Sequence, residues 1–483
     1  AVAPDGATVA TAGRDGIIHL WAGGSGRHLA RLEADRNRRP QVLYSSDGQR
    51  LIWWGAYAWS KTLRVWDPKT GQPVRRFDLE GPDVLWAAVS DDGKTAVSVD
   101  WKNKLDRFHD LTTGKVTREV PDDFHRPIAL SPSGDRLVGL DGTLMTVAGR
   151  KELVNIPRVY ASSASVRFAA DGRRLIAAAI AERSYKKYLS EPPAEEVAVV
   201  DTVEGKELRR FGLETDFRAI HAVALSRDGK TAVTVRGSGQ KPNEQVVTLW
   251  ETETGRERGY FRGHIGKVNG LAISPDGRFI MSASDDTTAL VWDATRPRTR
   301  DGFVRRESGP ADLPDRFKDL AGENAERAYA SIWTLVNAPK DAVPFLADQG
   351  ELFATTDVKK IRQWIQNLDH DRYADRERAT QELGLVLDEA ESNLREELRT
   401  NRSEEARRRI ELLLQARSTG VTGRELQRLR VIEVLEHVAA EGGEATRRAA
   451  VAVLKRLGDM PGRPTHEAKA TLERLGRGAE LKP

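Results

Sequence analysis

The sequence predicts a seven-bladed all-β propeller followed by an all-α domain. Two observations support this prediction. A tight-turn dipeptide recurs, mostly about every 40 to 48 residues, over roughly the first 295 residues, which is the period of a four-stranded propeller blade. Around Gly309 the hydrophobic period then changes from 2 residues, typical of strands, to 3.6, typical of helices.

The recurring dipeptide is Asp-Gly in six copies and Ser-Gly in one, and strand-like apolar runs flank each copy. Glycine adopts positive φ without a steric penalty and aspartate tolerates it, so each dipeptide predicts a tight hairpin. The seven copies are Asp5-Gly6, Asp47-Gly48, Asp92-Gly93, Ser133-Gly134, Asp171-Gly172, Asp228-Gly229 and Asp276-Gly277.

Two further signals follow the hairpin in most copies. The first is a strand that ends in an apolar or aromatic residue plus a polar one, as in Val65-Trp66-Asp67, and the second is a glycine turn, as in Thr70-Gly71. A last strand closes the unit. Each copy therefore predicts four strands, and seven copies predict seven blades.

Residues 263–293 form the fullest copy, with a Gly-His pair, a Ser-Pro-Asp-Gly turn and a closing Trp-Asp. This stretch resembles the WD40 repeat. The resemblance implies a hydrogen-bonded structural set made of His264, Ser282, Asp286 and Trp292. The first copy keeps Thr11, Asp15 and Trp21, whereas in the third copy Phe108 replaces the tryptophan and the fourth copy, residues 130–156, has none.

We expect the propeller to span residues 1–306 and the helical domain residues 307–483. The chain begins at the inner strand of a blade, so the outer strand that would precede it is absent. We expect truncation at the N-terminus. The alternatives are that Gly302-Phe303-Val304 replaces the strand or that further repeats lie upstream.

The C-terminal part predicts short amphipathic helices, including 323–336, 357–368, 371–387, 404–414, 424–440, 444–457 and 465–475. Short helices joined by short polar loops usually stack in antiparallel pairs, as HEAT-like solenoids do. Residues 369–373 and 376–383 resemble the helical extension of a group of bacterial WD40 proteins. This resemblance implies a scaffold that binds partners and implies no catalytic residues.

Composition limits the functional classes. The 483 residues include 76 Lys and Arg against 72 Asp and Glu, a net charge of +4, without a long basic block that would indicate nucleic-acid binding. There are no cysteines, which excludes disulfides and thiolate chemistry in this chain. No run approaches the roughly 18 apolar residues of a membrane span. Exported and cytoplasmic locations both agree with this composition.

Motifs that imitate active sites fail their own requirements. Gly93-Lys94-Thr95 and Gly229-Lys230-Thr231 lack the first glycine of a phosphate-binding loop. The His264, Ser282 and Asp286 combination has the composition of a hydrolase triad, but the WD40 set explains it. His370 is a lone metal-ligand candidate that a helix start explains better. We therefore predict no catalytic, cofactor or metal-binding residues.

Aromatic residues and insertions gather between the second and third strands of several copies, and in the sixth copy we expect a long connection from Arg236 to Gln245. Insertions at one repeat position emerge on one face of a propeller and usually mark its binding face. The candidate partner-binding residues are Trp53, Trp54, Tyr57, Trp59, Trp101, Tyr185 and Tyr188. The alternative for Trp53 and Trp54 is that they fill the core.

Three functional hypotheses remain. The first is a non-enzymatic scaffold whose propeller loops bind a protein partner and whose helical tail offers a second surface. The second is a ligand-binding or catalytic propeller that uses its central funnel, which rests on analogy between folds. The third is the sensing end of a longer chain whose N-terminal effector domain precedes Ala1.

Overall fold

The computed structural model describes residues 1–483 except 37–39, 56–60, 80–83, 122–126, 149–150, 157–165, 181–194, 213–218, 239–240, 300–311, 401–402, 420, 422, 461 and 481–483. The chain forms two compact units, Ala1–Arg298 and Thr299–Pro483. The expected boundary between residues 306 and 307 lies outside the described residues.

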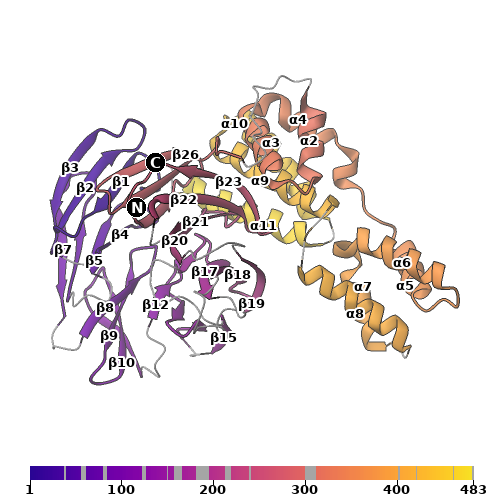
Figure 1. Ribbon diagram of the computed structural model, residues 1–483, viewed down its shortest axis with the longest axis horizontal. Coiled ribbons are helices and arrows are strands. Elements are labelled where there is room, and N and C mark those ends of the chain that lie inside the picture. Colours follow the sequence, from indigo (N-terminus) through magenta and orange to yellow (C-terminus); the bar gives the residue numbers. More distant parts are fainter. Residues whose placement is uncertain are drawn as a thin grey trace. The chain divides into compact units, whose positions relative to one another are not determined.

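The first unit is a seven-bladed β-propeller, as predicted (Figure 1). Every sheet is antiparallel and runs through its strands in chain order. The strands of blades 1 to 4 are β1 (Thr8–Ala12), β2 (Ile17–Ala22) and β3 (His28–Glu33); β4 (Pro40–Tyr44), β5 (Leu51–Gly55), β6 (Thr62–Trp66) and β7 (Pro73–Asp78); β8 (Val84–Val89), β9 (Thr95–Asp100), β10 (Leu105–Asp110) and β11 (Val116–Pro121); and β12 (Pro127–Leu130), β13 (Arg136–Gly139), β14 (Thr143–Thr146) and β15 (Glu152–Asn155).

Blades 5 to 7 continue the same strand order. Their strands are β16 (Val166–Phe168), β17 (Arg174–Ile180), β18 (Glu195–Asp201) and β19 (Lys206–Gly212); β20 (Ala219–Leu225), β21 (Thr231–Ser238), β22 (Lys241–Glu251) and β23 (Arg256–Arg262); and β24 (Val268–Ile273), β25 (Phe279–Ser284) and β26 (Ala289–Asp293).

All seven predicted hairpin glycines have positive φ, between 66° and 73°. The turn before them is a small polar network, which Ser90 and Asp92 illustrate. The Ser90 hydroxyl donates to Asp92 Oδ1 at 2.6 Å, Asp92 Oδ1 accepts from the Lys94 amide at 2.9 Å, and Ser90 Oγ accepts from the Thr95 amide at 3.0 Å. The same serine and aspartate pair recurs in blades 2, 6 and 7.

Arginines tie several of these turns to the next blade. Arg50 and Arg136 each donate through Nη1 to the carbonyl of the turn glycine one blade further on, at 3.3 and 3.2 Å. Arg174 does the same to Gly229 at 3.1 Å and pairs with the buried Glu253 at 2.6 Å. Because each arginine stands two residues after its own turn glycine, the turn sequence also determines the contact between blades.

The hydrophobic core lies in layers between neighbouring blades. One cluster joins Ile18 of blade 1 to Leu51 and Trp53 of blade 2, and others join blades 4 with 5 and 5 with 6. A blade with a neighbour on each side is therefore buried on both of its faces. The alternation of side chains along a strand directs them to two cores rather than to a core and a solvent face.

The chain after blade 7 returns to blade 6. The Tyr260 amide donates to the Arg298 carbonyl at 2.9 Å, and the Arg298 amide donates back to Tyr260 at 3.0 Å. Segment 295–298 thus lies beside β23, the outer strand of blade 6. Gly302-Phe303-Val304, the alternative outer strand of blade 7, lies outside the described residues.

One predicted loop is partly a strand. The sequence indicated a long connection from Arg236 to Gln245, but Ser238 pairs with Lys241, and β21 and β22 continue as an extended hairpin. The insertion in this copy therefore lengthens two strands, because backbone pairing satisfies the amides that a loop of this length would expose.

The second unit contains ten α-helices and one 3₁₀ helix among its described residues (Figure 1). Two of its helices begin with a side-chain cap: the Asn324 side chain accepts from the Arg327 amide, and the Asp357 side chain accepts from the Lys359 amide. The helices are α2 (Leu313–Ala321), α3 (Ala325–Asn337), α4 (Pro339–Asp348), η3 (Gly350–Phe353), α5 (Val358–Asn367), α6 (Tyr373–Leu385), α7 (Leu387–Thr400), α8 (Glu404–Thr419), α9 (Gly423–Glu441), α10 (Glu444–Gly458) and α11 (Arg463–Glu480).

Helix α9 is the centre of this unit and contacts α2, α3, α4, α10 and α11. It buries two arginines completely. Arg430 donates to the carbonyls of Leu320 and Gly322 at the end of α2, at 2.9 and 2.7 Å. Arg428 donates to the Leu352 carbonyl at 3.0 Å and pairs with the buried Glu389 at 3.3 Å. These arginines satisfy carbonyls that helix ends leave unpaired.

The inter-blade arginines predict a measurable loss of stability. Arg174→Met removes a donor from the Gly229 carbonyl and the cation from Glu253, whose side chain is 7% exposed. We expect the free energy of unfolding of the propeller to fall by about 3 kcal/mol in urea titrations followed by tryptophan fluorescence. Arg173→Met, at the exposed neighbouring position, is the control, and an equal loss in both variants would contradict the assignment.

The buried pair of the helical unit gives a second prediction. Arg428→Met leaves Glu389 without the cation that stands 3.3 Å away, and we expect a loss of about 3 to 5 kcal/mol. Arg424, on the same helix, lies 4.0 Å from the same carboxylate but its side chain is 43% exposed. Arg424→Met should therefore cost less than about 1 kcal/mol. Similar unfolding midpoints for the two variants would contradict the claim that the buried pair of Arg428 and Glu389 stabilises the helical unit.

Candidate functional site

The structure brings together the four side chains that the WD40 resemblance indicated in the last blade. His264 Nδ1 lies 2.8 Å from Asp286 Oδ2, and His264 Nε2 lies 2.7 Å from Ser282 Oγ. Trp292 Nε1 donates to the same hydroxyl at 2.8 Å. Although burial opposes its charge, hydrogen bonds from Thr288, His264 and the Ile265 amide hold the pKa of Asp286 well below its usual range.

This geometry supports a structural role for the set. A nucleophilic serine needs access to a substrate, but Ser282 is 1% exposed and its oxygen already accepts from Trp292. His264 lies in the segment before β24, and its bond to Asp286 ties this segment to the hairpin between β25 and β26. The set therefore fixes the edges of blade 7 together.

Blade 1 keeps part of the set. Trp21 Nε1 donates to Thr11 Oγ1 at 2.9 Å, the bond equivalent to that between Trp292 and Ser282. Asp15 turns to its own hairpin, where it accepts from the Ile17 amide at 3.0 Å.

Sequence reasoning missed two equivalent pairs. In blade 6, Trp250 Nε1 donates to Thr234 Oγ1 at 2.9 Å. In blade 3, His109 Nε2 lies 2.7 Å from Ser98 Oγ. The signal in the sequence was a serine or threonine at a fixed place in the second strand. In blade 6, for example, Ala232 pairs with Trp250, and the hydroxyl residue is Thr234, two positions after Ala232.

The strand register corrects the expectation for Phe108. Ala96 pairs with His109, as Ile280 pairs with Trp292, so His109 and not Phe108 occupies the tryptophan position. Phe108 packs in the core instead. Burial, and secondarily the charge of Arg107, lowers the pKa of His109 to about 4.

The candidate partner-binding residues separate into three groups. Trp53 and Trp54 are buried, at 0% and 7% exposure, which corrects their assignment to a binding face. Trp53 occupies the hydroxyl position of blade 2 and packs toward blade 1, while Trp54 packs toward blade 3. Trp101, in the turn between β9 and β10, is 44% exposed. The remaining candidates lie outside the described residues: Tyr57, Trp59, Tyr185 and Tyr188.

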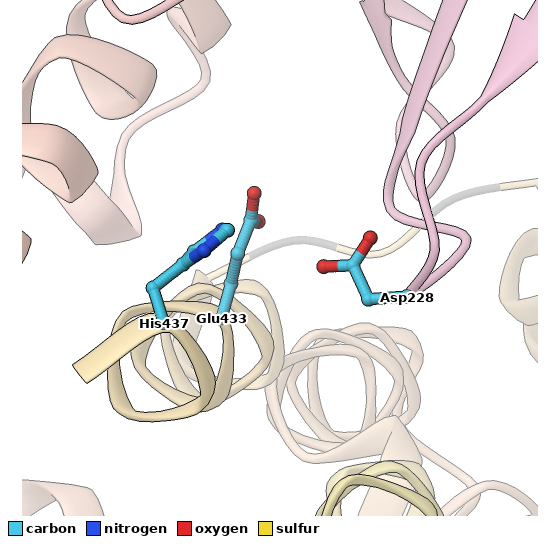
Figure 2. Close-up of side chains that lie close together, drawn as sticks. All are labelled: Asp228, Glu433 and His437. Atoms are coloured by element: carbon cyan, nitrogen blue, oxygen red, sulfur yellow. The ribbon is translucent and has the colours of Figure 1, made fainter. Parts of the chain in front are cut away.

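Within each unit taken by itself, the described residues contain no group of three His, Asp or Glu side chains close enough to share a metal ion. Figure 2 shows Glu433 and His437 one turn apart on α9, where the His437 ring also packs 4.7 Å from the Trp333 ring. Asp228, labelled in the same picture, belongs to a propeller hairpin and accepts from the Lys230 amide at 3.0 Å. Two ligands on one helix fall short of the three or four that zinc sites use. His370 pairs with Asp375 at 3.2 Å.

Comparison with known families gives a match at both ends of the propeller. The family described as "WD domain, G-beta repeat" matches residues 1–22 and 255–293. Residues 255–293 contain the complete polar set, and residues 1–22 contain Thr11 and Trp21. None of the helices in the described part of the chain is long and apolar enough to span a membrane.

Three curated relatives share parts of the chain. Mitochondrial division protein 1 of Aspergillus clavatus is 31% identical over 25% of this chain and 19% of its own length. Human WD repeat-containing protein 36 is 34% identical over 31% and 18%, respectively. Nuclear distribution protein PAC1 of Arthroderma benhamiae is 36% identical over 25% of each. This chain therefore matches a quarter or less of the length of each of these relatives.

The pH dependence of stability tests the role of His109. Its pKa is about 6.5 when unfolded and about 4 when folded, so its contribution is complete above pH 6.5 and is lost as the pH falls toward 4. His109→Gln keeps a hydrogen-bonding group without titrating. Relative to this variant, we expect the native protein to lose up to about 3 kcal/mol of unfolding free energy between pH 7 and pH 4. A constant difference across this range would contradict the assignment.

Seven repeated sheets make this chain a seven-bladed β-propeller followed by a helical region, and the polar set of the last blade and the partial family match show that residues 1–22 and 255–293 are similar to WD40 repeats.

Proposed function

We propose that the protein is a non-enzymatic interaction scaffold whose propeller binds a protein partner through one loop face. The face consists of the described connections between the second and third strands in blades 1, 3, 4 and 7, which emerge on the same side because every blade repeats one strand order. The single observation that supports it best is Trp101, a large aromatic residue that is 44% exposed in one of these turns. Tryptophan is enriched among the residues that dominate binding energy.

Charge adds to the case for this face. Lys102 and Lys104 follow Trp101 in the same turn and are exposed. Arg14, in the equivalent turn of blade 1, has a side chain that is 70% exposed. An aromatic anchor with a cationic rim is the composition of many protein-binding surfaces, in which the rim directs association.

The helical unit supplies the proposed second surface. Its helices α2 and α3, α5 and α6, α7 and α8, and α10 and α11 contact each other as sequential pairs, and this pairing is the feature that supports a HEAT-like interpretation, whereas the contacts of α9 with α2, α3 and α4 depart from a simple solenoid. Tyr373 at the start of α6 is 64% exposed, and the guanidinium groups of Arg376 and Arg409 lie 5.7 and 5.8 Å from its ring. We also propose that the boundary between the propeller and the helical domain lies near residue 306.

The central funnel offers a second candidate function. Asp91 follows the inner strand of blade 3 and Arg167 lies on the inner strand of blade 5, yet their charges interact. Because these blades are not neighbours, this interaction acts across the ring. Burial raises the pKa of Asp91 to about 6. A carboxyl group of this kind is a candidate acid or base for a small ligand in the funnel.

Partner capture separates these functions. Trp101→Ala should weaken the affinity for loop-face partners captured from native lysate by about thirtyfold, because a tryptophan at a hot spot often contributes about 2 kcal/mol or more. Tyr373→Ala, a matched exposed aromatic in the helical unit, should leave those partners bound. If Trp101→Ala folds and keeps every partner, the proposed face is wrong. If Asp91→Asn abolishes a turnover found in a hydrolase panel, the funnel function is correct instead.

A further inference from the structure

We propose that a groove on the rim of the propeller, between blades 1 and 2, docks an extended acidic segment of a partner protein. The groove has a volume of about 540 Å³ and lies between the outer strands β3 and β7. It is separate from the loop face proposed above, so it adds a second kind of contact to the propeller.

The groove exists because a repeated seam contact is missing. In blade 2, Arg75 reaches the Thr112 carbonyl of blade 3 at 2.7 Å, and in blade 3 the equivalent Arg118 reaches the Val147 carbonyl of blade 4 at 2.6 Å. The register places Ala30 at this position in blade 1. A methyl group cannot span to the next blade, and the seam between blades 1 and 2 stays open.

A second, smaller side chain also widens the groove between blades 1 and 2. The position of Phe77 in blade 2 and Phe211 in blade 5 holds the smaller Leu32 in blade 1. Phe77 packs beneath the turn glycine Gly114 of the next blade, and Phe211 packs beneath Gly255. Leu32 makes the equivalent contact with Gly71 but fills less of the seam.

Blade 6 shows what fits such a seam. There the position of Ala30 is Gly259, and the extended segment 295–298 lies against it: a Cβ added to Gly259 would stand 2.6 Å from Pro297. Backbone bonds between Tyr260 and Arg298 hold the segment in place. The residue equivalent to Tyr260 is Arg31, so the same backbone groups of β3 point toward the groove. An extended peptide can bind there in the same way.

The charges of the groove select an acidic occupant. Arg31, Arg64, Arg75 and Arg76 line it, against the single carboxylate of Glu33. Arg64 pairs with Asp35 and Arg76 with Asp78, at 2.6 and 2.8 Å, just beyond the lining. The Arg31 side chain is exposed and makes no hydrogen bond or ion pair among the described residues. The hydrogen bond that the described residues give Arg75 goes to the neutral Thr112 carbonyl, so no carboxylate pairs with its charge there.

Protection of an edge strand explains only part of this pattern. Proline and charged residues on an outer strand prevent pairing with other chains, and Pro73, Arg75 and Arg76 serve β7 in this way. Arg31 belongs to the opposite wall, and Ala30 leaves a gap rather than a barrier. Val74, 58% exposed at the same groove, adds an apolar contact for a partner side chain.

Peptide binding to the full chain tests the proposal. The probe is fluorescein-labelled Glu-Leu-Pro-Glu-Leu-Glu, compared with the same peptide carrying lysine in place of glutamate, by fluorescence anisotropy. Ala30→Arg restores the residue that closes the next two seams, and Arg31→Glu reverses an exposed charge. Arg448→Glu, whose native side chain is 75% exposed in the helical unit, is the charge-matched control. Thermal melting checks that each variant folds.

We expect saturable binding of the acidic peptide that weakens about tenfold or more in Ala30→Arg and Arg31→Glu, because each removes a determinant of the groove. Arg448→Glu and the native protein should bind alike, and the lysine peptide should not bind. Equal affinity of native protein and Ala30→Arg would overturn the proposal, as would no saturable binding, or binding of a short single-stranded DNA in preference to the acidic peptide. Loss of loop-face partners in Trp101→Ala is independent of these outcomes.

Discussion

The turn between the first two strands of each blade is the interaction on which the propeller depends. In blades 2, 3, 6 and 7 its serine and aspartate fix the hairpin, and in every blade its glycine has a φ that other residues rarely adopt. Between blades, the Ser46 amide donates to the Asp91 carbonyl at 2.8 Å and the Asp92 amide to the Pro132 carbonyl at 3.1 Å. One short motif therefore determines both the pairing of strands and the packing of sheets.

A ring built this way presents its departures from the repeat to solvent. Each departure changes one seam or loop while the turns hold the ring, which is how repeat folds acquire distinct surfaces. Ala30 opens the seam between blades 1 and 2, the turn of Trp101 extends from blade 3, and segment 295–298 covers Gly259 of blade 6. These differences between blades, rather than their shared core, carry the proposed binding functions.

The fold class follows from the sequence because its determinants are local: a dipeptide period and a change in hydrophobic period. The polar residues of the last blade also follow, since all four lie within one repeat. The errors arose from contacts between blades. Trp53 and Trp54 were candidates for the binding face, with core filling as the alternative, and both fill the core because a blade is covered on both faces. His109 was missed because only the register distinguishes it from Phe108.

Native-state hydrogen exchange tests the central claim most directly. If the turns hold the ring, the amides of Ser46 and Asp92, which donate to the next blade, should be among the slowest to exchange in the propeller, as slow as the strand amides beside them. The amide of Lys69, which bonds only to the Asp67 side chain within an exposed turn, provides the fast reference. Exchange of Ser46 and Asp92 at the rate of Lys69 would contradict the account.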